Sequence, residues 1–113
     1  MAFTLNESGK PLYLAASFDM SSNTELTMTF TKPDGTVVTK IKPDVVLETS
    51  PTTLPDVGAV LANEYVSYTV EPLFLDQAGA WCVYLTYDNT TPTPDDSFIG
   101  TVFNFTVAAT PCG

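Results

Sequence analysis

Short segments in which apolar and polar residues alternate cover most of this chain of 113 residues, and polar turns separate them. The clearest segment is residues 25–31, where Leu26, Met28 and Phe30 alternate with threonines. Successive side chains of a strand point to opposite faces, so this pattern predicts an antiparallel strand with one buried face and one threonine-coated face. The same alternation predicts further strands at residues 12–18, 36–41, 44–47, 64–70, 81–86 and 98–107.

A tight turn joins two of these strands. Pro33 fixes the backbone angle φ that the second turn position needs, Asp34 tolerates the third position, and Gly35 supplies a left-handed residue. Residues 25–40 are therefore predicted to form a β-hairpin that closes at this turn.

The second informative feature is Gly79, which follows a tight turn and precedes a strand that opens on Trp81. A sharp crossing between two sheets favours glycine, because glycine adopts backbone angles that other residues reach only with strain. A tryptophan under such a corner buries a large area and holds the turn in place. We predict that Trp81, Val83 and Leu85 face the core and that Tyr84 faces outwards.

Threonine, proline and serine dominate residues 48–58, and residues 88–97 form a second polar stretch, so both are predicted to be loops. Residues 59–62 fit either a short strand or a helical turn. About seven strands joined by such turns predict an all-β fold, an antiparallel sandwich rather than a parallel α/β sheet.

The chain is expected to be a single domain. Residues 12–108 are predicted to form the sandwich, residues 1–11 an N-terminal arm and residues 109–113 a C-terminal tail.

The corner resembles that of immunoglobulin-like domains, because Trp81 stands close to the place where these domains put a corner tyrosine. Cys82 follows the aromatic residue directly, and no earlier cysteine exists to pair with it. An antibody-type domain with an intersheet disulfide is therefore excluded.

Four segments, taken in order, resemble small immunoglobulin-like modules of tailed-bacteriophage virions: residues 23–30, 32–36, 65–70 and 79–81. The resemblance covers residues 12–107. It implies an immunoglobulin-like antiparallel β-sandwich of about seven strands and a role in capsid decoration, the baseplate or the tail. It carries over no functional residue, because such modules bind through surfaces that vary.

The composition narrows the classes of partner. The formal net charge is −9, the four basic residues are all lysines, and this balance argues against nucleic acid and anionic membrane surfaces. The first residues lack the basic and apolar regions of a signal peptide, and no apolar run is long enough to span a bilayer. The acidity favours solubility and repulsion between free copies.

Catalytic and metal chemistry have few candidates. The chain has no histidine, which removes the commonest general base and metal ligand. Asp95 and Asp96, with Asp88 across the loop, could flank a scissile bond, and together with Asn89 they could bind calcium. Adjacent aspartates in a polar loop are more often solvated, so we expect neither a catalytic site, a metal site nor a cofactor.

Three features concern contacts and cysteines. Phe3 and Leu5 lie in a polar context and could dock the arm on a neighbouring subunit, with fraying termini as the simpler alternative.

Tyr84 is the best candidate for an aromatic contact platform, with Tyr13, Tyr65 and Tyr87 as further candidates. Cys82 and Cys112 allow a disulfide, although two free thiols are the simpler expectation.

We therefore expect a non-enzymatic structural protein of a phage virion, assembled in the host cytoplasm. A capsid decoration or cement protein that binds the assembled shell is favoured over a tail, connector or baseplate component. A carbohydrate-binding or adhesin module is the other alternative. The expected partners are capsid or tail proteins or further copies of the chain, with no nucleic acid and no membrane.

Overall fold

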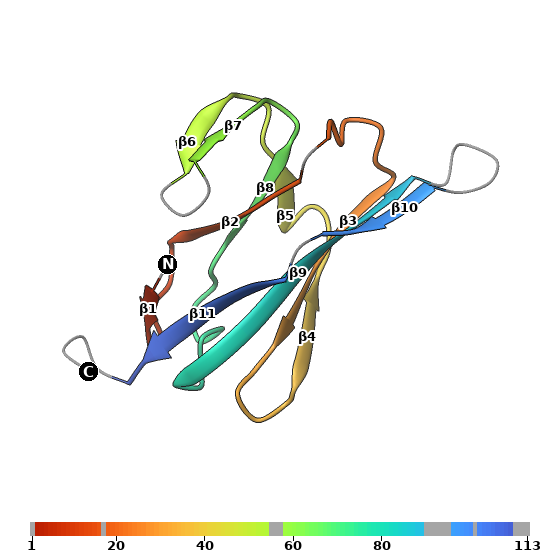
Figure 1. The fold of residues 1–113 in the computed structure, drawn as a ribbon. Coiled ribbons are helices and arrows are strands. Elements are labelled where there is room, and N and C mark those ends of the chain that lie inside the picture. The colour runs from red at the N-terminus through yellow and green to blue at the C-terminus, as the bar shows by residue number, and fades with distance from the viewer. Residues whose placement is uncertain (1, 17, 55–57, 90–95, 101, 110–113) are drawn as a thin grey trace.

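The computed structural model describes residues 2–16, 18–54, 58–89, 96–100 and 102–109, and these residues form strands and turns without a helix (Figure 1). The predicted all-β class is confirmed. The strands of this part of the chain are β1 (Ala2–Thr4), β2 (Pro11–Ala15), β3 (Glu25–Thr31), β4 (Val37–Lys40), β5 (Val45–Leu47), β6 (Thr52–Leu54), β7 (Gly58–Val60), β8 (Tyr65–Thr69), β9 (Gly79–Asn89), β10 (Asp96–Ile99) and β11 (Phe103–Ala108).

Two sheets share one core. The larger sheet has the order β1-β11-β9-β3-β4, with β10 also paired to β9, and the smaller has the order β2-β8-β5. One cluster of buried side chains joins them, with Leu12 and Val66 from the smaller sheet and Met28 and Trp81 from the larger. The chain crosses between the sheets after β8, at the predicted corner.

The alternating pattern places the core as predicted in the two central strands. Leu26, Met28 and Phe30 of β3 have no exposed surface. In β9, Trp81, Val83, Leu85 and Tyr87 are at most 3% exposed. These residues share one face because β3 and β9 are antiparallel neighbours over seven residue pairs.

The segment predicted as a loop at residues 48–58 contains β6, which pairs with β7 to form a small hairpin. Of residues 59–62, which were predicted as either a short strand or a helical turn, Ala59 and Val60 lie in strand β7. Leu54 and Val60 of this hairpin pack on Tyr65. They therefore cover one end of the side of the smaller sheet that points away from the main core. The threonine-rich composition concealed the apolar residues that give the hairpin its own small core.

The predicted strand at residues 98–107 is divided into β10 and β11, which both pair with β9. Ile99 pairs with Thr86 and Phe103 with Val83, so the returning chain holds one residue more than β9 between these pairs. This is the count of a β-bulge. The amide of Gly100 donates a hydrogen bond to the carbonyl oxygen of Leu85, with 2.7 Å between N and O, at the break between the two strands.

The prediction of a separate N-terminal arm is wrong. Strand β1 pairs in parallel with β11, so the larger sheet is not purely antiparallel. Phe3 is 2% exposed and meets Phe105 edge-on, with ring centroids 5.4 Å apart. Leu5 also packs against the main core. Residues 2–11 therefore belong to the sandwich, because their apolar side chains fill this chain's own core and are not free for a neighbouring subunit.

We expect Phe3→Ala to lower the free energy of unfolding by about 3 kcal/mol, because it removes a buried aromatic side chain and leaves a cavity. Leu61 is 62% exposed, and Leu61→Ala is the control, with an expected change within about 0.5 kcal/mol. Urea unfolding measures both. Equal changes in the free energy of unfolding for the two substitutions would contradict the burial of Phe3 and support a separate N-terminal arm.

Candidate functional site

The two segments that stand out in the sequence lie against each other in the structure. Gly79 has a φ of +126°, in the region that favours glycine, and the side chain of Pro33 lies directly beside it. A β-carbon at position 79 would stand 3.1 Å from Cγ of Pro33. Glycine is thus favoured at position 79 for two reasons: the backbone angle is positive, and the hairpin turn leaves little room for a side chain.

Polar contacts reinforce this junction of turn and corner. Nζ of Lys32 forms an ion pair with Asp76 at 2.9 Å. The amide of Asp34 donates to Oε1 of Gln77 at 3.3 Å, and Nε2 of Gln77 donates to Oδ2 of Asp34 at 2.9 Å. Gln77 also accepts, through its carbonyl oxygen, a hydrogen bond from the indole Nε1 of Trp81 at 2.9 Å. The junction is a structural device that joins the β3–β4 turn to the start of β9.

The turn itself has the expected backbone. Gly35 has a φ of +91°, and the amide of Thr36 donates to Oδ1 of Asp34 at 2.9 Å. Hydrogen bonds from Thr36, and then from Gln77, hold the pKa of the Asp34 carboxyl below its ordinary value of 3.8.

Tyr84 lies on the outer face of the larger sheet, as its alternation with Val83 and Leu85 predicts. It is half-buried and pairs with Thr29 across to β3. We call this surface the outer face, and the cross-strand pairs assign to it Thr27, Thr29, Thr31, Val37, Thr39, Cys82, Tyr84, Thr86, Ile99, Asn104 and Thr106. None of these residues carries a formal charge, and Val37 and Ile99 are 59% and 66% exposed. Among the described strand pairs, acidic side chains enter this face where Glu25 pairs with Asp88 at one end.

The four tyrosines considered as one platform do not lie together. Tyr13 and Tyr65 pack on each other under the β6–β7 hairpin, with ring centroids 6.0 Å apart. Tyr87 is 3% exposed and packs edge-on against Phe18 in the core. Only Tyr84 belongs to the outer face, so a shared aromatic platform is not formed.

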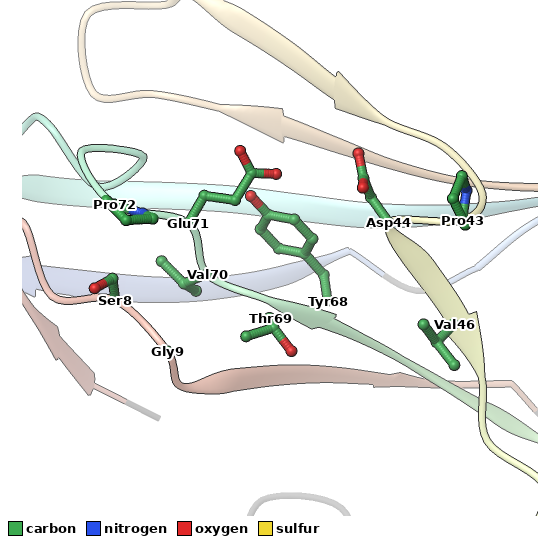
Figure 2. Close-up of a pocket in the computed structure, with 10 residues that line it drawn as sticks. All are labelled: Ser8, Gly9, Pro43, Asp44, Val46, Tyr68, Thr69, Val70, Glu71 and Pro72. Atoms are coloured by element: carbon green, nitrogen blue, oxygen red, sulfur yellow. The ribbon is translucent and has the colours of Figure 1, made fainter.

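Sequence reasoning missed an open depression of about 550 Å³ at the edge of the smaller sheet (Figure 2). Its lining includes Pro43, Asp44, Val46, Tyr68, Glu71 and Pro72. Tyr68 is 1% exposed, and its buried hydroxyl has no hydrogen-bond partner among the described residues. A tyrosine between Val66 and Val70 on a core-facing strand was the available signal, because its hydroxyl has to end somewhere beyond an apolar core.

The loop considered for calcium or catalysis lies largely outside the described residues, which exclude Asp95 and the side chain of Asp96. Within the described part of the chain, no group of three or more His, Cys, Asp or Glu residues could hold a metal ion. Cys82 is a half-buried free thiol on the outer face, and Cys112 lies outside the described residues. In the part of the chain that the structure describes, there is no helix long and apolar enough to cross a membrane.

No protein family, characterised protein or solved structure matches this chain at a significant level.

We expect Gly79→Ala to destabilise the fold by at least about 1 kcal/mol more than Gly35→Ala. Both place a β-carbon at positive φ, at a strain of about 1–3 kcal/mol, but only position 79 also meets a neighbour. A double-mutant cycle with Pro33→Ala, followed by urea unfolding, measures the coupling. Independent effects of the two substitutions would show that the close approach of Pro33 carries no energy.

We expect the stability advantage of the native protein over Asp34→Asn to depend on pH. A carboxyl with a lowered pKa contributes stability above its unfolded pKa of about 3.8 and loses it as the pH falls through the folded pKa. Urea unfolding of both proteins at about pH 6 and about pH 2 measures this, and the advantage is expected only at the higher pH. An advantage that is equal at both would contradict the role of the ionised carboxylate.

Proposed function

We propose that the chain is a non-enzymatic structural protein of a phage virion, an immunoglobulin-like module that decorates the assembled capsid shell. The observation that carries the proposal is the uncharged outer face on a chain with a net charge of −9. Charged residues are depleted at the centres of protein interfaces, whereas tyrosine is enriched there. Tyr84 at the centre of this face, with Val37 and Ile99 towards its two sides, has that composition.

The favoured occupant of the outer face is the shell protein rather than a second copy of the chain. The high negative charge makes free copies repel one another and stay dispersed before assembly. A regular shell presents many identical surfaces, so a small module with one neutral face can bind repeatedly without contacting itself. A tail, connector or baseplate position uses the same face, and the number of copies in a particle distinguishes it.

The carbohydrate-binding alternative has less support. It requires several accessible aromatic side chains on one surface, and Tyr84 is separated from Tyr13, Tyr65 and Tyr87.

The first experiment is quantitative mass spectrometry of purified particles from the source. A copy number comparable to that of the major shell protein supports decoration, and a small symmetric number supports a tail or connector position. Absence of the chain from the particles would overturn the virion role.

We expect Tyr84→Lys to reduce binding to assembled particles by at least about tenfold, because it places a charge at the centre of the outer face. Thr53→Lys is the control, since it adds the same charge at an exposed position of β6. Co-sedimentation with particles that lack the protein measures binding, and thermal unfolding verifies that both variants are folded. Wild-type binding by Tyr84→Lys would show that the outer face is not the docking surface.

A further inference from the structure

Leu73 lies at a tight turn in the connection from β8 to β9. Pro72 and Leu73 are the central residues of this turn, in which the amide of Phe74 donates to the carbonyl oxygen of Glu71 at 3.2 Å. Proline holds a negative φ at the first central position, whereas Leu73 has a φ of +65°. This combination is that of a type II turn, whose second central position favours glycine.

Leucine is an unfavourable residue for this backbone angle. The other residues with positive φ in the described part of the chain are Asn6, Asn63 and four glycines. Glycine and asparagine adopt left-handed angles readily, whereas the β-carbon of a leucine comes too close to the following carbonyl oxygen. Leu73 is therefore strained, although residues that fit the same angle are used at all the other such positions described.

The packing of the core explains the turn but not the leucine. Phe74 packs edge-on against Phe30 and Tyr68, with ring centroids 4.9 Å and 5.2 Å apart, and Leu75 has no exposed surface. The contacts of Phe74 and Leu75 hold the backbone in place at position 73. The side chain of Leu73 adds little to this packing, because it is 72% exposed, the largest fraction among the large hydrophobic side chains described.

Exposure and strain coincide at this one residue. A single exposed leucine is ordinary on a protein surface, and strain at a single residue persists where its neighbours hold it. A glycine at position 73 would remove both the strain and the exposed apolar side chain. Strained residues are concentrated at functional sites, so their presence favours a functional reason for the side chain. An apolar side chain on a rigid turn suits a protein contact, because it loses little conformational freedom on binding.

We propose that Leu73 inserts into an apolar pocket of the shell protein, as a second contact besides the outer face. The proposal rests on the function proposed above. A second copy of the chain is a less suitable partner, because each copy carries a net charge of −9. The carboxylates of Glu71 and Asp76 also flank the turn, and their side chains are 49% and 46% exposed.

The first test concerns stability and needs no partner. We expect Leu73→Gly to raise the melting temperature by about 4 °C, because it relieves the strain at positive φ. Leu61→Gly is the matched control, since Leu61 is 62% exposed and is not among the residues with positive φ. Glycine at position 61 only adds freedom to the unfolded chain and is expected not to raise the melting temperature. An unchanged or lower melting temperature of Leu73→Gly would overturn the proposal.

The second test is co-sedimentation with particles that lack the protein. We expect Leu73→Gly and Leu73→Asn to weaken binding by at least about tenfold, because both residues fit the turn and both remove the apolar side chain. Leu61→Asn is the control and is expected to bind as the wild-type protein does.

The outcomes separate this contact from the virion role. Wild-type binding by both Leu73 variants would overturn the contact and leave the outer face as the docking surface. Failure of the wild-type protein itself to bind the particles would overturn the virion role. Self-association of the free protein that Leu73→Gly abolishes, measured by analytical ultracentrifugation, would overturn the shell protein as the partner of Leu73.

Discussion

Strand β9 is the element on which the rest of the larger sheet depends. It pairs with β3 along one side and with β10 and β11 along the other, so it connects every strand of that sheet. Its register commits Trp81 to the core and Tyr84 to the outer face. A slip of one residue would exchange these two faces and expose the tryptophan, so the buried aromatic side chain fixes the register of the whole sheet.

The corner before β9 adds a second constraint on the same register. Gly79 begins the strand, and Pro33 approaches it from the turn between β3 and β4. The contact can form only where β3 and β9 are aligned as their residue pairs require. The ion pair from Lys32 to Asp76 lies at the same junction. Local turn chemistry and long-range pairing therefore favour one arrangement, which is the consistency expected of a sequence that specifies a single fold.

The central hairpin and the two faces of β9 could be predicted from the sequence, because alternation and turn residues act locally. Strand β1 could not, since Phe3 is buried only by a parallel pairing with residues about a hundred positions away. The β6–β7 hairpin was concealed by threonines and prolines, although Leu54 and Val60 supply its apolar contacts. The contact of Pro33 with Gly79 could not be predicted either. Each residue indicates a turn, but neither indicates that the two turns contact each other.

The two candidate surfaces also differ in whether local or long-range effects determine them, and so in whether the sequence could predict them. The outer face is the direct complement of the alternating core positions, and Tyr84 could therefore be placed from sequence. The depression arises because Tyr68 occupies a core-facing position but is longer than its valine neighbours, so its hydroxyl reaches the edge where Asp44 and Glu71 lie. A flat neutral face, such as the outer face of the larger sheet, suits a broad contact with a partner.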